Sequence, residues 1–570
     1  MRLGNVIPIS LVVLATAMAC APSQTGQQSG TGPLAATPGA HRGTLKIAWM
    51  REAESLHPKF YLGPGMAEYG WTFNSWLTYL DFGGVSHPMM ARELPTRDNG
   101  DWVVNTDGTM VTTYRLRPNI KWHDGAHVTA RDFAFGFEVY VDPDLPVTNR
   151  APESFMSSVE APDDLTIVIS WKVPYVSANA LGYQMLDPLP RHLLEEKYRT
   201  NKPQFTFGEE WRSGYVGAGP FRVESWDPGT SILARANDDW FLGPPKLASI
   251  DIRIIPDTNT LLVNLLSGDV QMSNSPSLRG NEAVFARDQW AARSEGYTKV
   301  WETRLRYMHF QYRDVQNWQP AVTDVSIRRA LMHAMDRQAL VEGVNFGLGE
   351  PADAYFLPSD ALFPEVDRAV SKYPYDPGRA STLLTERGWR RTSDTGLITD
   401  STGQTLALPV WRSAGPSDEK ELSIIADFWK AVGINSQIYI IPSARRDDNE
   451  FQSSFPGGFV AARTISPDGF VWVSDQVAAA ESRWTGSNRG SFHDPEIDRL
   501  AKQTTTLLDV KERNEATLAL HRRTTDLVGF GPLYYEIEVI VARSNVKGPV
   551  GNYGPQQGIT WNVFEWEVNE

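Results

Sequence analysis

Two histidines four residues apart, His123 and His127, come nearest to a metal-binding motif in this sequence. On a helix this spacing would place both imidazoles on one face, as in zinc proteases, where a glutamate beside the first histidine acts as the base. Here Gly125 lies between the histidines, and Asp124 stands where the glutamate would be. The preceding YRLRPNIKW segment is typical of a strand and loop. We therefore expect a tight turn here and no metal site.

Motifs for other kinds of catalysis are missing from the sequence. It contains no Gly-x-Ser-x-Gly elbow, no P-loop and no Gly-x-Gly-x-x-Gly segment that opens a helix. Neighbouring carboxylates such as Asp163-Asp164 and Asp447-Asp448 are typical of solvated loops, because nothing in the sequence brings two of them together around a scissile bond. We therefore expect no catalytic residue and no cofactor, and hence a protein that is not an enzyme.

The single cysteine, Cys20, comes after Arg2, an apolar run from Val6 to Leu14 and a few small residues. These parts predict a secretory signal peptide over residues 1–19, too short to remain as a transmembrane helix. The Ala-Met-Ala-Cys ending resembles the bacterial lipobox, in which the chain is cut before the cysteine and the thiol receives a diacylglycerol. The lipobox prefers leucine where Ala17 stands, so a plain secretory signal with a chance cysteine is the alternative.

The composition of the chain after the signal peptide indicates a tether and a soluble body. Residues 21–42 carry one formal charge and few large apolar side chains, so 20–42 should be a lipidated cysteine with a flexible tether. The whole chain of 570 residues is 41% hydrophobic and 21% charged, which is typical of a soluble globular protein. Its net charge of −14 argues against nucleic acid or an anionic membrane surface as the main partner. We expect an extracytoplasmic protein held at a bacterial membrane by its lipid alone.

Strands and helices alternate along the rest of the chain. β-Branched and aromatic residues between turn formers predict strands at 45–50, 164–171 and 249–256. N-cap residues predict helices that start after Thr129 (with Asp132 at the third position), Asp324, Asp376-Pro377 and Asp494-Pro495. After Asp324, the residues Ile327, Leu331 and Met335 occur at four-residue spacing. The class is a mixed α/β protein with more than one lobe.

One long stretch, YRLRPNIKWHDGAHVTARDFAFGFE at 114–138, resembles the signature of a known family. It contains a strand that ends in Leu-Arg, a Lys-aromatic-His-Asp-Gly turn and a Thr-Ala-x-Asp helix start. This is the pattern of the dipeptide- and oligopeptide-binding proteins of ABC importers, extracellular solute-binding protein family 5. Further blocks agree in order, namely 159–170, 188–194, 217–245, 325–337, 375–389 and 492–500.

The resemblance covers roughly 43–550 and implies an α/β, two-lobed periplasmic-binding-protein-like fold (type II, cluster C). The implied parts are a first lobe at 43–300 with an extra small domain at about 85–215, a second lobe at 301–540, and a return of 541–570 to the first lobe. Two hinge crossings are expected near 300–308 and 535–545. The implied partners are an ABC permease with its ATPase subunits and a peptide-like ligand, bound by a monomer whose lobes close around it.

The identity of the ligand is the open question. Peptide binders of this family hold the ligand's amino group with an aspartate a few residues before a Pro-Asp pair. If Pro467-Asp468 is that pair, the amine-binding position falls near Arg463, where a guanidinium would repel an ammonium and favour a carboxylate or phosphate. Alternatively the loop is shifted and Asp468 takes the role, or Arg463 makes no ligand contact.

The remaining candidates are chosen by position in the implied cleft. The ligand-binding candidates are Glu52, Glu54, Trp71 and Asn74 from the first lobe, and Trp411, Arg463, Asp468, Trp484, Asn488 and Phe492 from the second. The three tryptophans stand in loop-like settings and would suit stacking on a sugar. An oligosaccharide therefore stays open as the ligand beside a peptide. A secreted hydrolase and a sensor lipoprotein are the alternatives from other functional classes.

Overall fold

The structure is a computed structural model. It describes residues 43–60, 65–147, 150–274, 277–391, 396–415, 418–445, 448–465, 472–551 and 558–569. The signal peptide, Cys20, the tether and Asp468 lie outside these ranges, so the expectations for them stay predictions.

One large sheet runs through the molecule. In the described residues it has ten strands, in the order β16-β15-β17-β12-β18-β11-β1-β10-β9-β8. The bounds in that order are Ile438–Ile441, Val410–Ser413, Gly458–Thr464, Gly296–Phe310, Phe530–Arg543, Met272–Ser273, Thr44–Trp49, Ser249–Ile254, Ser231–Ala236 and Phe221–Asp227.

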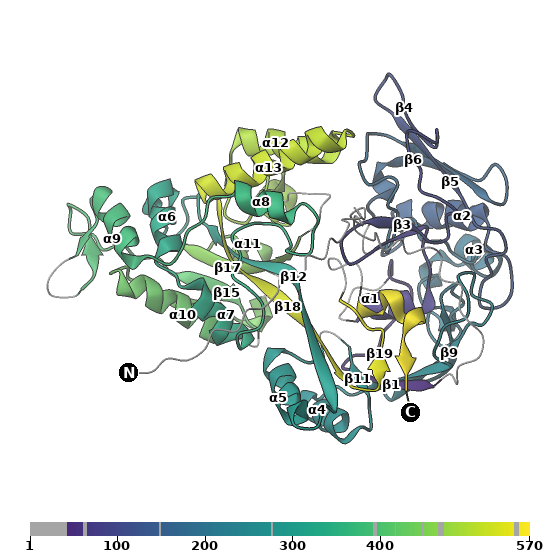
Figure 1. Cartoon of the computed structure of the whole chain (residues 1–570). Helices are drawn as coiled ribbons and strands as arrows, with labels where there is room; N and C mark the ends of the chain where they lie inside the picture. Colours follow the sequence, from purple (N-terminus) through teal and green to yellow (C-terminus); the bar gives the residue numbers. More distant parts are fainter. Residues whose placement is uncertain are drawn as a thin grey trace, which may run out of the picture.

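The two longest strands, β12 and β18, join the two ends of this sheet. They pair antiparallel from Gly296 with Arg543 to His309 with Phe530. On one side β18 pairs with β11, and on the other β12 pairs with β17. Figure 1 shows the two strands as the bridge between a lobe that contains β1 together with the C-terminal end of the chain and a lobe with α6 to α13. We call these lobe one and lobe two.

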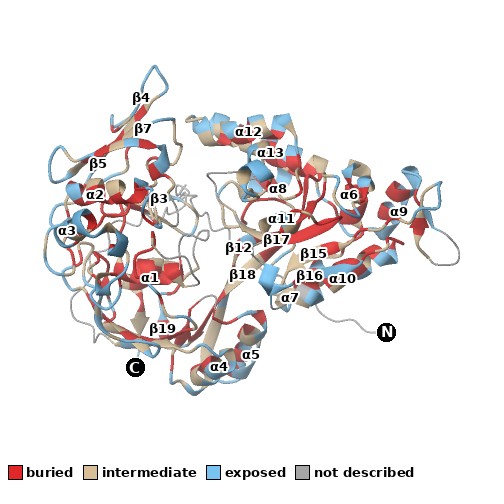
Figure 2. Ribbon diagram, turned by 180° about the vertical axis from the view of Figure 1, so that it is seen from behind, coloured by how far each residue is buried: buried red, intermediate tan, exposed pale blue. Residues whose placement is uncertain are grey.

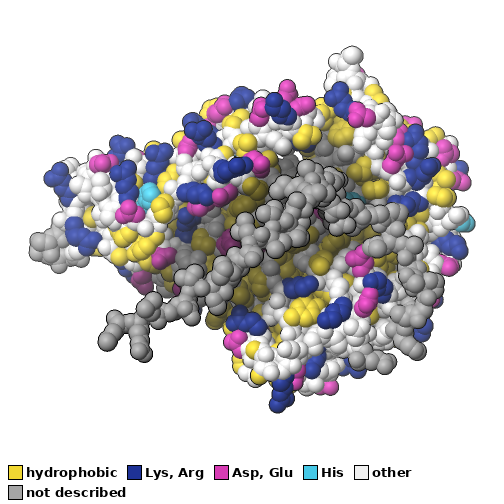
Figure 3. Space-filling view, viewed as in Figure 1, with side chains coloured by type: hydrophobic (Ala, Val, Ile, Leu, Met, Phe, Trp, Pro, Cys, Tyr) yellow, Lys and Arg dark blue, Asp and Glu magenta, His cyan; other side chains and the backbone are white. Residues whose placement is uncertain are grey.

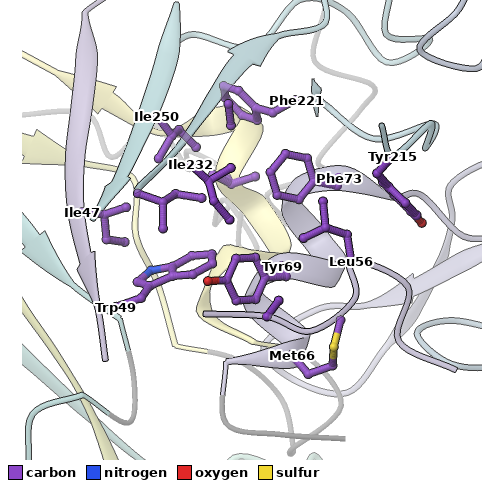
Figure 4. Close-up of a cluster of buried hydrophobic side chains, with 14 of the residues drawn as sticks. Ile47, Trp49, Leu56, Met66, Tyr69, Phe73, Tyr215, Phe221, Ile232 and Ile250 are labelled. Carbon is purple, nitrogen blue, oxygen red and sulfur yellow. The ribbon is translucent and has the colours of Figure 1, made fainter. Parts of the chain in front are cut away.

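Each lobe has its own hydrophobic core, and both long strands contribute to both cores. Around β1, the core of lobe one contains Trp301 of β12 and Ile540 of β18, and Figure 4 shows its centre, with the rings of Trp49 and Tyr69 side by side. The core of lobe two contains Met308 of β12 and Leu533 of β18. Buried residues accordingly gather inside each lobe, β12 and β18 are of intermediate exposure where they pass between the lobes, and exposed residues gather on the outer helices (Figure 2).

Smaller sheets complete the two lobes. A four-stranded sheet in lobe one has the order β4-β5-β7-β6, with bounds Trp102–Val104, Met110–Arg115, Thr166–Trp171 and Met156–Glu160. It packs with α2 around a separate core, which includes Tyr114, Phe133 and Trp171. The paired short strands are β2 (Thr78–Leu80) with β3 (Ser86–Pro88), β13 (Arg390–Arg391) with β14 (Ile398–Thr399), and β19 (Val546–Lys547) with β20 (Glu567–Val568).

Thirteen α-helices cover the two lobes in the described residues. In lobe one they are α1 (Met66–Phe73), α2 (Ala130–Val141), α3 (Arg191–Thr200), α4 (Thr258–Ser267) and α5 (Gly280–Ala291). In lobe two they are α6 (Val325–His333), α7 (Arg337–Asn345), α8 (Phe363–Ala369), α9 (Pro377–Glu386), α10 (Asp418–Ala431), α11 (Asn449–Gln452), α12 (Pro495–Thr506) and α13 (Val510–Leu527). The predicted starts of α2, α6, α9 and α12 are confirmed. Only Met335 differs from its expected place, because α6 ends at His333.

The His-Asp-Gly turn also forms as expected. The backbone N–H of Gly125, whose φ is +94°, donates to the carbonyl of Trp122, and the N–H of Ala126 donates to the Asp124 carboxylate at 3.0 Å. The ring of His123 lies 3.1 Å from the carbonyl oxygen of Gly219. These contacts join the turn to the segment before β8.

A buried ion network joins the two long strands to lobe two. Glu421 of α10 is fully buried and accepts from Tyr534 of β18 at 2.7 Å. Its carboxylate also lies 3.2 Å from Nε of Arg306 in β12 and pairs with Arg412 of β15. Arg306 is paired in turn with Glu536 at 3.1 Å. Because every charge here has an opposite charge beside it, the network tolerates its burial.

This network forms one wall of a cavity of about 260 Å³ between α5 and α7. Arg279 lines it from lobe one, Thr303 and Glu536 from the long strands, and Asn345 from lobe two. Burial acts to raise the pKa of Glu536, but the surrounding guanidinium groups, above all that of Arg306, hold this pKa below its usual value. Glu536 is therefore ionised beside the arginines that line this cavity.

Substitution Glu421→Gln tests the network. It would leave two buried guanidinium groups without this carboxylate, so we expect a loss of about 3–5 kcal/mol in the free energy of unfolding, measured by urea denaturation. The matched control is Glu138→Gln, which breaks the exposed pair with Arg199 and should cost less than about 1 kcal/mol. Equal losses in the two variants would contradict the assigned role.

Candidate functional site

The directions of the strands place a candidate site between the lobes. In lobe one, β1 is parallel to β10 and β11, and β11 runs antiparallel to β18, so its carboxyl end points toward lobe two. In lobe two, β15, β16 and β17 are parallel, and β17 runs antiparallel to β12, so its carboxyl end points toward lobe one. Open α/β sheets bind ligands at the carboxyl ends of their strands. Figure 3 shows the molecule hollowed between the two lobes.

Arg463 occupies this edge of lobe two. It lies one residue before the end of β17 and pairs in register with Leu305 of β12. Its Nη1 donates to the hydroxyl of Ser487 at 2.7 Å. Burial lowers the pKa of Arg463 below its usual value. The residue that sequence reasoning placed at the ligand position thus stands half-buried at the carboxyl edge of the sheet.

A second arginine, Arg489, lies next to Arg463 and was missed by sequence reasoning. Burial lowers the pKa of Arg489, and the positive charge of Arg463 lowers it further, against an opposing effect of Tyr307. The guanidinium group lies 5.4 Å from the ring centre of Phe459 in β17, and it donates to the side-chain carbonyl of Gln452 in α11. The two guanidinium groups are therefore close enough to repel each other.

Aromatic residues lie beside this pair. Trp411 is half-buried in β15, opposite Phe459 in the parallel ladder. Its ring centre is 4.5 Å from that of Tyr439 and 5.1 Å from that of Phe451. The expectation of a loop setting for Trp411 is wrong, because the residue belongs to a strand. Its place one strand away from Arg463 keeps it a candidate.

Trp484 lies in the segment after β17 along the chain. It is half-buried, and its ring stacks with the guanidinium group of Arg313 at 5.2 Å. Arg313 also donates to the backbone carbonyls of Ala478 and Arg489. Trp484 is thus linked through Arg313 to the backbone of Arg489.

Asn488 and Phe492 have structural partners in this same segment. The Asn488 amide is fully buried, donates to the carbonyls of Val473 and Phe492, and accepts from the N–H of Phe492. The ring of Phe492 packs against Tyr312 and Phe530 in the core. Both residues hold the segment that carries Ser487 and Arg489, and their packing accounts for them without a ligand.

On the other side of the hollow, Glu52 and Glu54 come after the carboxyl end of β1. The Glu52 carboxylate accepts from the indole N–H of Trp226 and from the N–H of Gly229 at 3.1 Å, so it holds the β8–β9 turn. Glu54 is exposed. Of the two, Glu54 is the more exposed to solvent.

Trp71 and Asn74 lie inside lobe one. Trp71 belongs to α1, which makes the expected loop setting wrong, and it is only 1% exposed against Trp76 and Tyr183. Asn74 ends α1, donates to the carbonyls of Leu56 and Gly70, and accepts from Tyr215. The structure therefore groups Trp411, Arg463 and Trp484, and sets Trp71 and Asn74 apart from them.

Metal-binding clusters and membrane-spanning helices are missing from the described ranges. No group of three or more His, Cys, Asp or Glu side chains there is arranged to hold a metal ion. None of the helices in these ranges has the length and apolar character needed to cross a bilayer.

Two lobes joined by paired strands, with strand ends facing each other across a hollow, define the class of two-lobed solute-binding proteins. The chain belongs to one family of this class, because a sequence model described as "Bacterial extracellular solute-binding proteins, family 5 Middle" matches residues 64–480. It is therefore an extracytoplasmic solute-binding protein and not an enzyme.

Known relatives bind different solutes. The oligopeptide-binding protein AppA of Bacillus subtilis (strain 168) is 25% identical over 472 residues, which cover 81% of this chain and 81% of that protein. The structure of B. subtilis AppA with a nonapeptide superposes with a TM-score of 0.66 at 21% identity, covering 93% of this chain and 99% of that one. NikZ of Campylobacter jejuni with Ni(L-His) superposes with a TM-score of 0.69 at 21% identity, covering 93% and 100%.

Substitution Asn488→Ala tests whether this residue positions the segment or contacts ligand. Loss of three buried hydrogen bonds at about 1 kcal/mol each should lower stability by roughly 2–3 kcal/mol and speed amide hydrogen exchange within 473–492. The control is Asn562→Ala, a buried amide of lobe one, which should leave exchange in 473–492 unchanged. Normal exchange in Asn488→Ala together with lost ligand binding would show direct contact instead.

Proposed function

We propose that this chain is the lipid-anchored substrate-binding subunit of an ABC importer and captures a peptide or a similar polar oligomer between its lobes. One observation carries this proposal. The carboxyl ends of β11 in lobe one and β17 in lobe two point toward each other along the paired strands β12 and β18. A ligand that contacts both edges stabilises the closed arrangement of the lobes over the open one. A permease would then recognise the closed form.

A peptide fits this edge because an extended chain can bond through its backbone to strand ends and to the segments next to them. The similarity to oligopeptide-binding AppA supports the same ligand class. The solutes named for the relatives differ, however, so the family alone does not decide the ligand.

An oligosaccharide is the second candidate. The half-buried Trp411 with its neighbours Tyr439 and Phe451 forms an aromatic surface beside the sheet edge, and aromatic rings of this kind stack on sugar faces. Trp484 adds a further ring in the same lobe, although Arg313 already covers one of its faces.

Native mass spectrometry of the gently purified full chain separates the candidates. We expect a set of co-purified short peptides. A series of masses spaced by a hexose or pentose unit would instead indicate that the protein binds saccharides, and Trp411→Ala should then abolish saccharide binding. Turnover of the bound solute would contradict a binding role altogether.

Closure can be measured directly because Cys20 is the single cysteine. In a Cys20→Ser background, Thr106→Cys next to β4 and Glu515→Cys in α13 place fluorescent labels on exposed positions of opposite lobes. β4 and α13 stand on the same side of the molecule (Figure 1). Energy transfer should rise on addition of the co-purified solute. Unchanged transfer on saturating binding would contradict capture by closure.

Lipid anchoring at Cys20 has its own test. Cys20→Ser removes the thiol that would carry the diacylglycerol, and acyl chains supply the membrane affinity of such proteins. The variant should leave the salt-washed membrane fraction for the soluble fraction. Ser23→Ala in the tether is the control and should stay with the membrane. A Cys20→Ser protein that remains membrane-bound would contradict the lipid anchor.

A further inference from the structure

Arg463 and Arg489 are half-buried, and within the described ranges each has fewer hydrogen-bond partners than the buried arginines of lobe two have. Arg306 and Arg337 are paired with carboxylates, and Arg328 donates to three backbone carbonyls. Among the residues that the structure describes, Arg463 donates to a serine hydroxyl and Arg489 to a glutamine carbonyl. Both hydrogen-bond acceptors are neutral.

Among the described residues, no carboxylate is recorded as acting on the pKa of either arginine. Tyr307 and His309 of β12 lie close to both. Burial raises the pKa of Tyr307, and burial together with the two arginines holds the pKa of His309 well below its usual value, so both side chains are neutral near pH 7. Partly buried like charges without a counter-charge are unfavourable. A negative group placed here would relieve that cost.

The geometry suits a planar anion. A guanidinium group presents a fork of N–H donors that matches a carboxylate in a bidentate arrangement. Arg463 lies at the carboxyl edge of β17, and Arg489 is held over the Phe459 ring of the same strand. The hydroxyl of Ser487 lies beside Arg463 and can donate to the same group. A carboxylate at this edge would sit between the lobes.

We propose that Arg463 and Arg489 form an anion-binding site in lobe two that takes a carboxylate of the solute. This rests on the proposed function, because it assigns the class of solute captured between the lobes. The carboxylate can belong to a peptide or to a uronic acid of an oligosaccharide. In both cases the two guanidinium groups select the acid over its neutral counterpart.

The test compares matched acids and neutral analogues on the full chain in mild detergent, by isothermal titration calorimetry. One pair is penta-alanine and its carboxyl-terminal amide, and the other is trigalacturonate and its methyl ester. At least one acid should bind about tenfold or more tightly than its neutral partner, because hydrogen bonds to charged groups are worth that much. Which pair responds identifies the source of the carboxylate.

Arg463→Gln and Arg489→Gln should each reduce the affinity for the responding acid at least about tenfold and leave that for the neutral partner unchanged. Arg463→Lys keeps the charge and should retain part of the preference. The control is Arg523→Gln in α13, whose partner is Asp494, and it should bind as the wild type does. Thermal melting of each variant separates a lost site from a lost fold.

Equal affinity for acid and neutral partner, an acid preference that survives both glutamine substitutions, or no binding of either acid would overturn this inference. None of these results would contradict the proposed function. That function is decided by the co-purified solute and by closure of the lobes, so a neutral co-purified solute that closes them would leave importer binding standing and remove the anion site.

Discussion

The antiparallel pairing of β12 with β18 is the constraint on which the rest of the structure depends. Both strands belong to both cores, so any movement of one lobe relative to the other must bend or twist this ladder. The register shifts after Glu302 and after Arg306, and such bulges bend and twist a strand locally. Because β11 and β17 are hydrogen-bonded to these two strands, the ladder also determines where the strand ends of the two lobes meet.

Charge is treated in two different ways around this ladder. On the α10 side, Glu421 and Glu536 neutralise the arginines that are buried with them. At the end of β17, Arg463 and Arg489 lie half-buried with neutral described acceptors. A protein that only had to be stable would gain by compensating both sets, since uncompensated buried charge is costly. A protein that binds and releases a solute can leave the counter-charge to the solute.

Sequence signals predicted the features that depend on neighbouring residues. Each of three helices is capped by residues at its own start: α2 by Thr129 with Asp132, α9 by Asp376 and α12 by Asp494. The capping residue and the group that it bonds are at most three positions apart, so the sequence alone is enough to predict where these helices begin. Helix α1 has no such signal: its N-cap is Gly65, with φ +85° and no capping side chain. Trp71 therefore looked like a loop residue, although contacts with Trp76 and the distant Tyr183 bury it in a helix.

The same holds for the candidate site: some of its residues could be predicted from neighbouring sequence, and others depend on contacts with distant parts of the chain. Arg463 could be chosen because the resemblance to the peptide binders puts a ligand-binding position a few residues before Pro467-Asp468. Arg489, in contrast, acquires its position from Gln452, 37 residues earlier, and from the ring of Phe459. Asn488 and Phe492 lie in the same segment, and from the sequence alone they are equally good candidates for ligand binding. Only their partners distinguish them from the arginines. The Asn488 amide is bonded to buried backbone groups and has little left for a ligand. Within the described part of the chain, each of the two guanidinium groups has one neutral oxygen as its acceptor, which leaves most of its donors for a ligand.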